Sequence, residues 1–284
     1  MRFQFIVRHE SRWPVALMCQ VLDVSRSGYY AWKRRPRSKR SERRERLTKM
    51  IQIVHAESRK TYGSPRVHRQ LLALGYRCCV NFVAKWMRRA GIVAKSRRKF
   101  KCTTDSRHTS PVAPNLLDRN FSPERANQAW ATDITYIPTR EGWLYLCTVE
   151  DLYSRRIVGW SASGRIDSRL VVDAWRMAIA LRRPEPGLIA HSDRGSQFCS
   201  EHFQSLLRRH GLRSSMSRKG NCYDNAPMES FYRTLKVELV YWEDYTTRRE
   251  ATASIGQYIE MFYNRRRLHS TLGYVSPVEY EVAA

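Results

Sequence analysis

The stretch LIAHSDRGSQF, from Leu188 to Phe198, predicts a short buried strand that ends at an acidic side chain. Its apolar start has the length of a strand, and the His-Ser-Asp and Arg-Gly steps that follow are typical of a strand end and a turn. Asp193 is therefore expected just beyond the carboxyl end of the strand. Because open α/β sheets carry reactive groups at that edge, the stretch predicts an α/β fold with a site at Asp193.

A second acid, Glu229, lies in the stretch SMSRKGNCYDNAPMESFYRTLK, from Ser215 to Lys236. An Asp-Asn pair that can cap a helix and a proline suited to its first turn predict a helix that begins just before Glu229. Apolar residues share one face of this helix, whereas Glu229, Arg233 and Lys236 share another. A carboxylate among cations is most often a surface ion pair, and this stretch alone leaves that interpretation open.

A third acid, Asp133, lies in QAWATDITYI, from Gln128 to Ile137, where alternating aromatic and β-branched residues predict a strand. A half-buried carboxylate costs free energy unless it is paired, hydrogen-bonded or bound to a cation. The nearest basic residues along the chain are Arg125 and Arg140. A metal ion is therefore a reasonable partner for Asp133, and a cluster of three acids favours a site over a plain surface ion pair at Glu229.

The three acids lie in motifs that are similar to those of a known family: W-x-T-D-I-T-Y at Asp133, H-S-D-x-G-x-Q-F at Asp193 and D-N-A-x-x-E-S-F at Glu229. Thirty-five residues lie between Asp193 and Glu229. The pattern resembles the Asp-Asp-Glu triad of DDE transposases with a retroviral-integrase-like core, most closely the OrfB protein of the bacterial insertion sequence three family. The resemblance covers nearly the whole chain. It implies a ribonuclease-H-like mixed sheet preceded by small all-α helix-turn-helix segments.

The resemblance also implies a chemistry. Three carboxylates suit Mg²⁺, which prefers oxygen ligands, and a pair of such ions can stabilise both the attacking and the leaving oxygen of a phosphodiester. Asp133 is expected to bridge two Mg²⁺ ions, and Asp193 and Glu229 are expected to hold one each, with Mn²⁺ as a substitute. Water would first free a 3′-hydroxyl, which would then attack another phosphodiester. A serine nucleophile gains no support, because no G-x-S-x-G occurs.

The net charge of +25 is concentrated in the first part of the chain. Residues 1–120 hold 29 Lys and Arg against 7 Asp and Glu, whereas residues 121–284 hold 22 against 19. A basic module beside a nearly neutral one is typical of a protein that holds a polyanion with one part and acts on it with the other. The densest run, from Lys33 to Lys49, fits direct phosphate contact and a solvated basic arm equally well.

Two segments of this basic part have the pattern of helix-turn-helix units, one from Ala16 to Trp32 and one from Tyr62 to Lys95. Such units often present their second helix to the major groove, and we expect Lys85, Arg88 and Arg89 to contact DNA. Helical hairpins also occur without a DNA role. The Y-G-x-P-R segment that begins at Tyr62 resembles one in the family and favours DNA binding.

These patterns divide the chain into four parts. We expect a helix-turn-helix-like segment at 1–40, a helix-turn-helix-like DNA-binding domain at 41–100, a proline-punctuated linker at 101–122, and the catalytic core with a C-terminal helical extension at 123–284. In the core, three consecutive strands are followed by alternating helix and strand, which is a mixed α/β pattern.

Other residues are weaker candidates. Further DNA contacts are expected at Arg233, Lys236 and Arg267. The last of these lies in a segment that resembles the family's Y-N-x-x-R-x-H, with Leu268 where proline is usual. His191 can orient a ligand or be a satisfied core histidine, and Tyr153 and its two neighbouring arginines can touch DNA or mark an ordinary strand edge.

Seven scattered cysteines without a C-x-x-C pair predict neither a zinc site nor a disulfide framework, and the chain shows no signal peptide or membrane span. A bacterial cytoplasmic, nucleoid-associated protein is expected. The family resemblance implies DNA as partner, both the element's terminal repeats and the target, together with a homo-oligomer on DNA. It also implies the upstream-frame protein OrfA, either separate or fused.

The predicted function is that of a transposase, which cleaves DNA strands and transfers them to move a bacterial insertion sequence. Two alternatives stay open. A ribonuclease-H-like nuclease without strand transfer would use the same three acids. A non-catalytic DNA-binding regulator would need only the basic helices.

Overall fold

The computed structural model describes residues 1–35, 38–95, 112–218 and 222–283. The chain divides into two compact units, Met1–Ile53 and Val54–Ala284, and each is described by itself. Within the described residues, no helix combines the length and the apolar character needed to cross a membrane.

The first unit is helical. Its elements are α1 (Arg2–His9), α2 (Val15–Val21), α3 (Arg26–Arg34) and the start of α4 (Lys39–Glu57). Ile6, Met18, Cys19 and Tyr29 form its small core. The side chain of Ser25 caps α3 by accepting a hydrogen bond from the Gly28 amide at 3.0 Å, as its position before the predicted second helix requires.

The second unit begins with the end of α4, followed by α5 (Ser64–Ala73) and α6 (Val80–Arg89). Val67 and Leu71 of α5 and Val83 and Met87 of α6 are buried, and the two helices pack together. Gly75 follows α5 with φ +82°, a conformation that glycine adopts without strain. The helix pair predicted between Tyr62 and Lys95 is therefore present.

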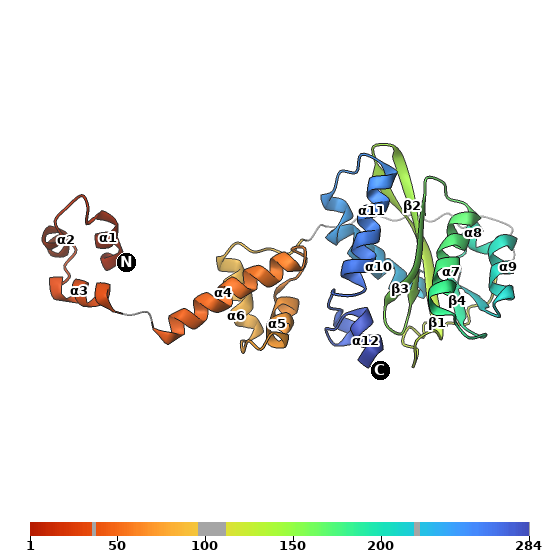
Figure 1. Cartoon of the computed structure of the whole chain (residues 1–284), viewed down its shortest axis with the longest axis horizontal. Coiled ribbons are helices and arrows are strands. Elements are labelled where there is room, and N and C mark those ends of the chain that lie inside the picture. The colour runs from red at the N-terminus through yellow and green to blue at the C-terminus, as the bar shows by residue number, and fades with distance from the viewer. Residues whose placement is uncertain (36–37, 96–111, 219–221, 284) are drawn as a thin grey trace. The chain divides into compact units, whose positions relative to one another are not determined.

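A five-stranded sheet forms the centre of this unit, and Figure 1 shows it between two groups of helices. Its strands are β1 (Ala129–Thr139), β2 (Gly142–Asp151), β3 (Arg156–Ser163), β4 (Ile189–Ser192) and β5 (Arg213–Met216). The order is β3-β2-β1-β4-β5. The β1–β2 and β2–β3 pairs are antiparallel, and β1–β4 and β4–β5 are parallel. The predicted mixed α/β, ribonuclease-H-like class is confirmed.

Helices connect the parallel strands, as parallel pairing requires. They are α7 (Ser168–Arg182) before β4, and α8 (Ser196–Cys199) and α9 (Glu201–Arg209) before β5. The main core lies under α7 and includes Trp130, Trp175 and Phe203. A Cβ at Gly159 would lie 2.3 Å from the carbonyl oxygen of Ala174, so this glycine lets β3 and α7 approach closely.

The last part of the chain is helical and lies on the other side of the sheet from α7 (Figure 1). Its longer elements are α10 (Ala226–Glu238), α11 (Arg248–Gln257), the π-helical segment η3 (Tyr258–Tyr263) and α12 (Pro277–Ala283). Short 3-10 turns complete it: η1 (Cys222–Asn225), η2 (Val240–Trp242) and η4 (Ser270–Leu272). The packing of α10 against β1 positions the site.

The four-part division of the chain stays a prediction. The first half of the predicted linker, 101–111, lies outside the described residues, but 112–122 is described. There the amides of Leu116 and Leu117 donate to the Ser215 hydroxyl at 2.9 and 3.3 Å, and the Met216 amide donates to the Pro114 carbonyl at 3.3 Å. The described end of this segment therefore packs along β5.

Candidate active site

Asp133 lies in the middle of β1, half-buried and opposite Thr148 of β2. Its Oδ1 accepts a hydrogen bond from the Ile134 amide at 2.7 Å. Burial raises the pKa of Asp133 well above its usual value, the negative charges of Asp193 and Glu229 raise it further, and nearby Lys236 lowers it. The charges of Asp193 and Glu229 therefore both reach Asp133, although the three acids come from separate elements.

Asp193 directly follows β4, as predicted. Ala131 of β1 is in register with His191 of the parallel strand β4, and each acid follows two residues later, so Asp133 and Asp193 lie level on neighbouring strands. The Oδ1 atom of Asp193 accepts a hydrogen bond from the Gly195 amide at 2.8 Å, which stabilises the turn beyond the strand.

Glu229 lies exposed in the first turn of α10. Partial burial raises the pKa of its carboxyl. The helix has the predicted sides: Met228, Phe231 and Leu235 are buried against the sheet, whereas Arg233 is exposed beside Glu229. Cations and an acid thus share the outward face of α10.

Lys236 is half-buried on this outward face, and its ammonium lies 4.9 Å from the centre of the Tyr136 ring. The positive charge of Lys236 also lowers the pKa of Asp133, so Lys236 interacts electrostatically with this acid.

Tyr232 was not predicted and joins the two main elements of the site. Its hydroxyl donates a hydrogen bond to the backbone carbonyl of Asp133 and lies 3.3 Å from that of Leu146, while the Thr148 hydroxyl donates to it at 3.0 Å. The side chain is 6% exposed. A tyrosine on the apolar face of α10, three residues after Glu229, is the signal that could have revealed it, because a buried phenol needs a hydrogen-bond partner.

His191 is a satisfied core histidine. It is fully buried, its Nδ1 lies 2.9 Å from the Ser215 hydroxyl, and its Nε2 donates to the Asp224 carbonyl at 2.9 Å. Burial lowers the pKa of the imidazole, so it is neutral near pH 7. Of its two interpretations, the structure supports the core one, in which His191 ties β4 to β5 and to the segment before α10.

Asp224 anchors the same segment. It is 1% exposed and accepts hydrogen bonds from Arg119 Nε at 2.9 Å and Arg218 Nε at 3.0 Å. Burial alone would raise the pKa of Asp224, but the hydrogen bonds from both arginines hold it well below its usual value. Of the predicted Asp-Asn cap, Asn225 takes the N-cap position of α10 without a side-chain capping bond, and the Asp224 side chain binds the two arginines.

Arg267, predicted as a DNA contact, is buried in the structure and not on the surface. It is 4% exposed, and its Nε and Nη2 donate to Glu238 at 3.0 and 2.8 Å. The Tyr258 hydroxyl donates to the same carboxylate at 2.7 Å, and Arg66 Nη1 lies 3.7 Å from it. A guanidinium engaged in this way in the interior is not available to a phosphate.

The Y-G-x-P-R segment has a similar role. Tyr62 is 3% exposed, and its hydroxyl donates to the Arg266 carbonyl at 3.0 Å and accepts from the Leu268 amide at 2.8 Å. Tyr62 therefore fastens the segment before α5 to the segment after η3, and Arg66 of α5 lies beside Glu238 at the end of α10. Leu268 stands where the family has proline, and it supplies an N–H that proline lacks.

The predicted contacts Lys85, Arg88 and Arg89 are all exposed on α6. By contrast, Arg155 donates to the Phe121 carbonyl at 2.7 Å, and Arg156 donates to Glu281 at 2.7 Å. The three cations of α6 therefore stay as proposed DNA contacts, whereas the two arginines after β2 bind partners within the chain.

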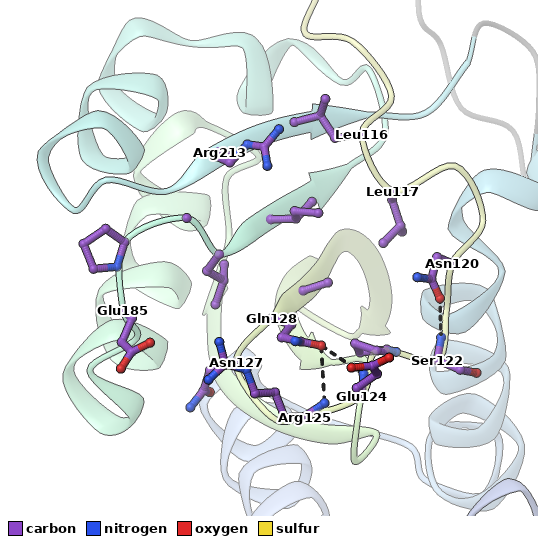
Figure 2. A pocket seen from close by; sticks show the side chains of 16 residues that line it. Leu116, Leu117, Asn120, Ser122, Glu124, Arg125, Asn127, Gln128, Glu185 and Arg213 are labelled. Carbon is purple, nitrogen blue, oxygen red and sulfur yellow. Dashed lines mark hydrogen bonds between the residues drawn. The ribbon is translucent and has the colours of Figure 1, made fainter.

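A cavity of about 560 Å³ lies at the opposite end of the parallel strands, where Ala129, Ile189 and Arg213 begin β1, β4 and β5. Figure 2 shows Gln128 beside it, accepting hydrogen bonds from the amides of Glu124 at 2.9 Å and Arg125 at 3.3 Å. Because the acids lie toward the other end of these strands, this cavity is not part of the acidic site.

Comparisons with known proteins identify the family. The description "Integrase core domain" belongs to two family models, which match residues 123–222 and 229–283, and an "HTH-like domain" model matches residues 42–100. An uncharacterized 31 kDa protein of insertion element IS600 from Shigella sonnei is 46% identical over 263 residues, 93% of this chain and 97% of that protein. Transposase InsF of insertion sequence IS3A from Escherichia coli strain K12 is 44% identical over 283 residues, 99% of this chain and 98% of InsF. The chain belongs to the IS3 transposase family.

Among solved structures, the catalytic core domain of HTLV-2 integrase in complex with magnesium is 16% identical, with a TM-score of 0.44 over 56% of this chain and 98% of that one. Membership of the transposase family makes the chain a polynucleotidyl transferase, as predicted.

The acids of this transposase fit a divalent ion by their chemistry. All three offer carboxylate oxygens, and the repulsion that raises the pKa of Asp133 is what a cation relieves. Among the described residues, no group of three or more His, Cys, Asp or Glu is arranged as a complete metal site. Mg²⁺ commonly takes only one or two carboxylates and completes its shell with water and substrate phosphate.

Proposed function

We propose that Asp133, Asp193 and Glu229 are the catalytic residues of this transposase and hold two Mg²⁺ ions, for which Mn²⁺ can substitute. One observation carries the proposal: Asp133 and Asp193 each follow two residues after the paired Ala131 and His191 of β1 and β4, and α10, whose first turn carries Glu229, packs against β1. Bound Mg²⁺ ions supply stabilisation of charge on the attacking and leaving oxygens of a phosphodiester.

The chain's own residues orient the DNA around these acids. Arg233 and Lys236 lie on the same face of α10 as Glu229 and can bind phosphates on either side of the reacting one. In the first reaction, water attacks the phosphorus at the element's end and the leaving oxygen becomes a free 3′-hydroxyl. In the second, that hydroxyl attacks a target phosphodiester, so each step forms one P–O bond and breaks one.

The rest of the proposal concerns assembly. Exposed Lys85, Arg88 and Arg89 of α6 bind the terminal repeats, and target DNA lies over the acids. The transposase acts as a homo-oligomer on DNA, together with the upstream-frame protein OrfA or fused to it, in the bacterial cytoplasm at the nucleoid. Arg66 of α5 lies 3.7 Å from Glu238 at the end of α10, and this contact supports transmission of DNA binding to the helix of Glu229.

A strand-joining assay tests the function. Labelled element ends are incubated with Mg²⁺ and the full chain, with and without the upstream-frame product, and compared with Asp133→Asn, Asp193→Asn and Glu229→Gln. We expect each variant to bind DNA and to lose cutting and joining. Cutting without joining by the wild-type chain would indicate a nuclease, binding without cutting would indicate a regulator, and cutting retained in all three variants would refute the acidic site.

A further inference from the structure

A second cavity, of about 230 Å³, lies along the flank of α10. The helix contributes Ala226, Pro227, Ser230, Phe231 and Thr234 to its wall. These residues lie beside the face that carries Glu229, and Ser230 follows Glu229 directly in the sequence. The cavity therefore borders the acidic site, but none of the three acids lines it.

Glu150 of β2 lines this cavity and is 1% exposed. Its Oε1 has one long contact, 3.5 Å from Arg155 Nη1, and its Oε2 has no hydrogen-bond partner among the described residues. A buried polar atom left without a partner costs about 1–3 kcal/mol. Burial raises the pKa of Glu150 to about 8, so near pH 7 it is a neutral acid that can both donate and accept a hydrogen bond.

The remaining wall combines aromatic rings with uncharged polar groups. Phe231 and Tyr263 pack edge to face, with ring centres 4.9 Å apart. The His269 ring lies beside them, and burial lowers its pKa to about 3, so it is neutral. Arg155 brings a positive charge, but its Nη2 already donates to the Phe121 carbonyl at 2.7 Å.

The size and chemistry of the wall limit the occupant. Pockets for drug-sized ligands are usually about 300–1,000 Å³, so this cavity suits a single planar ring system. A protonated carboxyl is a poor ligand for a metal ion, and the neutral imidazole of His269 is a single ligand. Proteins that take a base out of a DNA stack hold it between aromatic or apolar side chains and bind its edge with hydrogen bonds, and this wall offers both.

We propose that the cavity beside α10 receives one unpaired nucleobase of the DNA bound at the acidic site, with the free oxygen of Glu150 bonded to the edge of the base. The proposal rests on the proposed function, since it requires DNA to lie across Glu229. The base binds in the cavity on one face of α10, and the phosphodiester reacts at the adjacent face, which carries Glu229. The cavity thereby fixes which phosphodiester of the strand lies at the acids.

Base extrusion tests this proposal through fluorescence. The full chain is bound to element-end duplexes that carry 2-aminopurine singly at each of the last few positions of either strand. Because 2-aminopurine brightens when it leaves the base stack, we expect one position to brighten severalfold on binding, both in the wild-type chain and in Glu229→Gln. The signal is read before any strand is cut.

Three variants locate the extruded base. Thr234→Trp fills the cavity, Glu150→Leu removes the hydrogen-bonding edge, and Thr246→Trp places the same bulk at an exposed threonine outside the cavity. We expect the first two to lose at least half of the brightening, with DNA affinity within about threefold, and the third to keep it. Thermal unfolding identifies a misfolded variant. If Thr234→Trp does not fold, the brightening of Glu150→Leu alone tests the proposal.

The outcomes separate the two proposals. Brightening at no position, or brightening that both cavity variants retain, would overturn the nucleobase site even if the wild-type chain joins strands. Brightening that the cavity variants lose, in a chain that joins no strands with its partner present, would uphold the nucleobase site and overturn the proposed function.

Discussion

The hydroxyl of Tyr232 in α10 donates a hydrogen bond to the backbone carbonyl of Asp133 in β1. The helix that carries Glu229 is therefore bonded to the strand that carries Asp133 at Asp133 itself. This bond helps to set the position of Glu229 relative to Asp133. A displacement of about 1 Å at a reacting group can cost a hundredfold in rate, so this bond is expected to matter for catalysis more than for stability.

Tyr232→Phe is predicted to slow strand joining by about tenfold or more, because α10 can then shift against β1, while the free energy of unfolding falls by only about 0.5–1.5 kcal/mol. Single-turnover joining rates and urea unfolding measure the two effects. Tyr245→Phe is the matched control, since Tyr245 is also buried and its hydroxyl lies 3.1 Å from that of Ser254. Equal joining rates for the two variants would contradict a positioning role for Tyr232.

Arg267→Met is predicted to lower the free energy of unfolding by about 3–5 kcal/mol, because it leaves the charge of Glu238 buried without its main partner. The double variant Arg267→Met with Glu238→Met should recover most of the loss, since it removes both charges. Urea unfolding of the single and double variants measures this. If Arg267→Met instead weakens DNA binding and leaves stability unchanged, Arg267 is a DNA contact after all.

Arg88→Gln is predicted to weaken binding of all DNA sequences and to reduce the slope of log K against log salt by about one, as expected for the loss of one phosphate contact. Fluorescence anisotropy at several salt concentrations gives the slope. Arg209→Gln, at an exposed arginine of α9, is the control and should leave the slope unchanged. A slope that is the same for both variants would show that Arg88 makes no phosphate contact.

Glu150→Gln is predicted to change how stability depends on pH. The folded-state pKa of Glu150 is raised from 4.5 to about 8, so between these values the folded state holds a proton that the unfolded state has released. The free energy of unfolding of the wild type therefore falls as pH rises through this window and levels off above it. At 1.36 kcal/mol per pKa unit, the total fall is at most roughly 5 kcal/mol.

Urea unfolding between pH 4 and pH 9 checks this prediction. Because Asp133 and Asp151 also have raised pKa values, only the difference between wild type and variant isolates Glu150. The free energy of unfolding of Glu150→Gln should rise relative to that of the wild type as pH rises toward 8. A constant difference across the range would show that Glu150 is not buried as a neutral acid.

The sequence was sufficient for the strand of Asp133, the strand end at Asp193 and the sided helix of Glu229, because periodicity and turn residues specify local structure directly. It could not distinguish Arg267 in the interior from Arg88 on the surface. An arginine in a sequence motif looks the same whether its guanidinium binds a phosphate or a buried carboxylate. Glu238, the carboxylate that binds Arg267, lies in another segment of the chain.

Glu150 shows the same limit. In the stretch VED it resembles a polar strand end, and only the packing of α10 and of the segment around His269 shows that it lines a cavity and has one oxygen without a partner among the described residues. Tyr62 is a further case, since its partners Arg266 and Leu268 are joined to it only by the fold. Long-range partners of polar groups are what sequence patterns leave undetermined.

The most direct test of the central claim is to locate Mn²⁺ by its anomalous X-ray scattering in crystals of the full chain bound to an element end. We expect anomalous peaks at about 2.0–2.2 Å from carboxylate oxygens of Asp133, Asp193 and Glu229, by analogy with the ligand distances of Mg²⁺. No peak at these acids in a DNA-bound crystal, or peaks held by other residues, would contradict it.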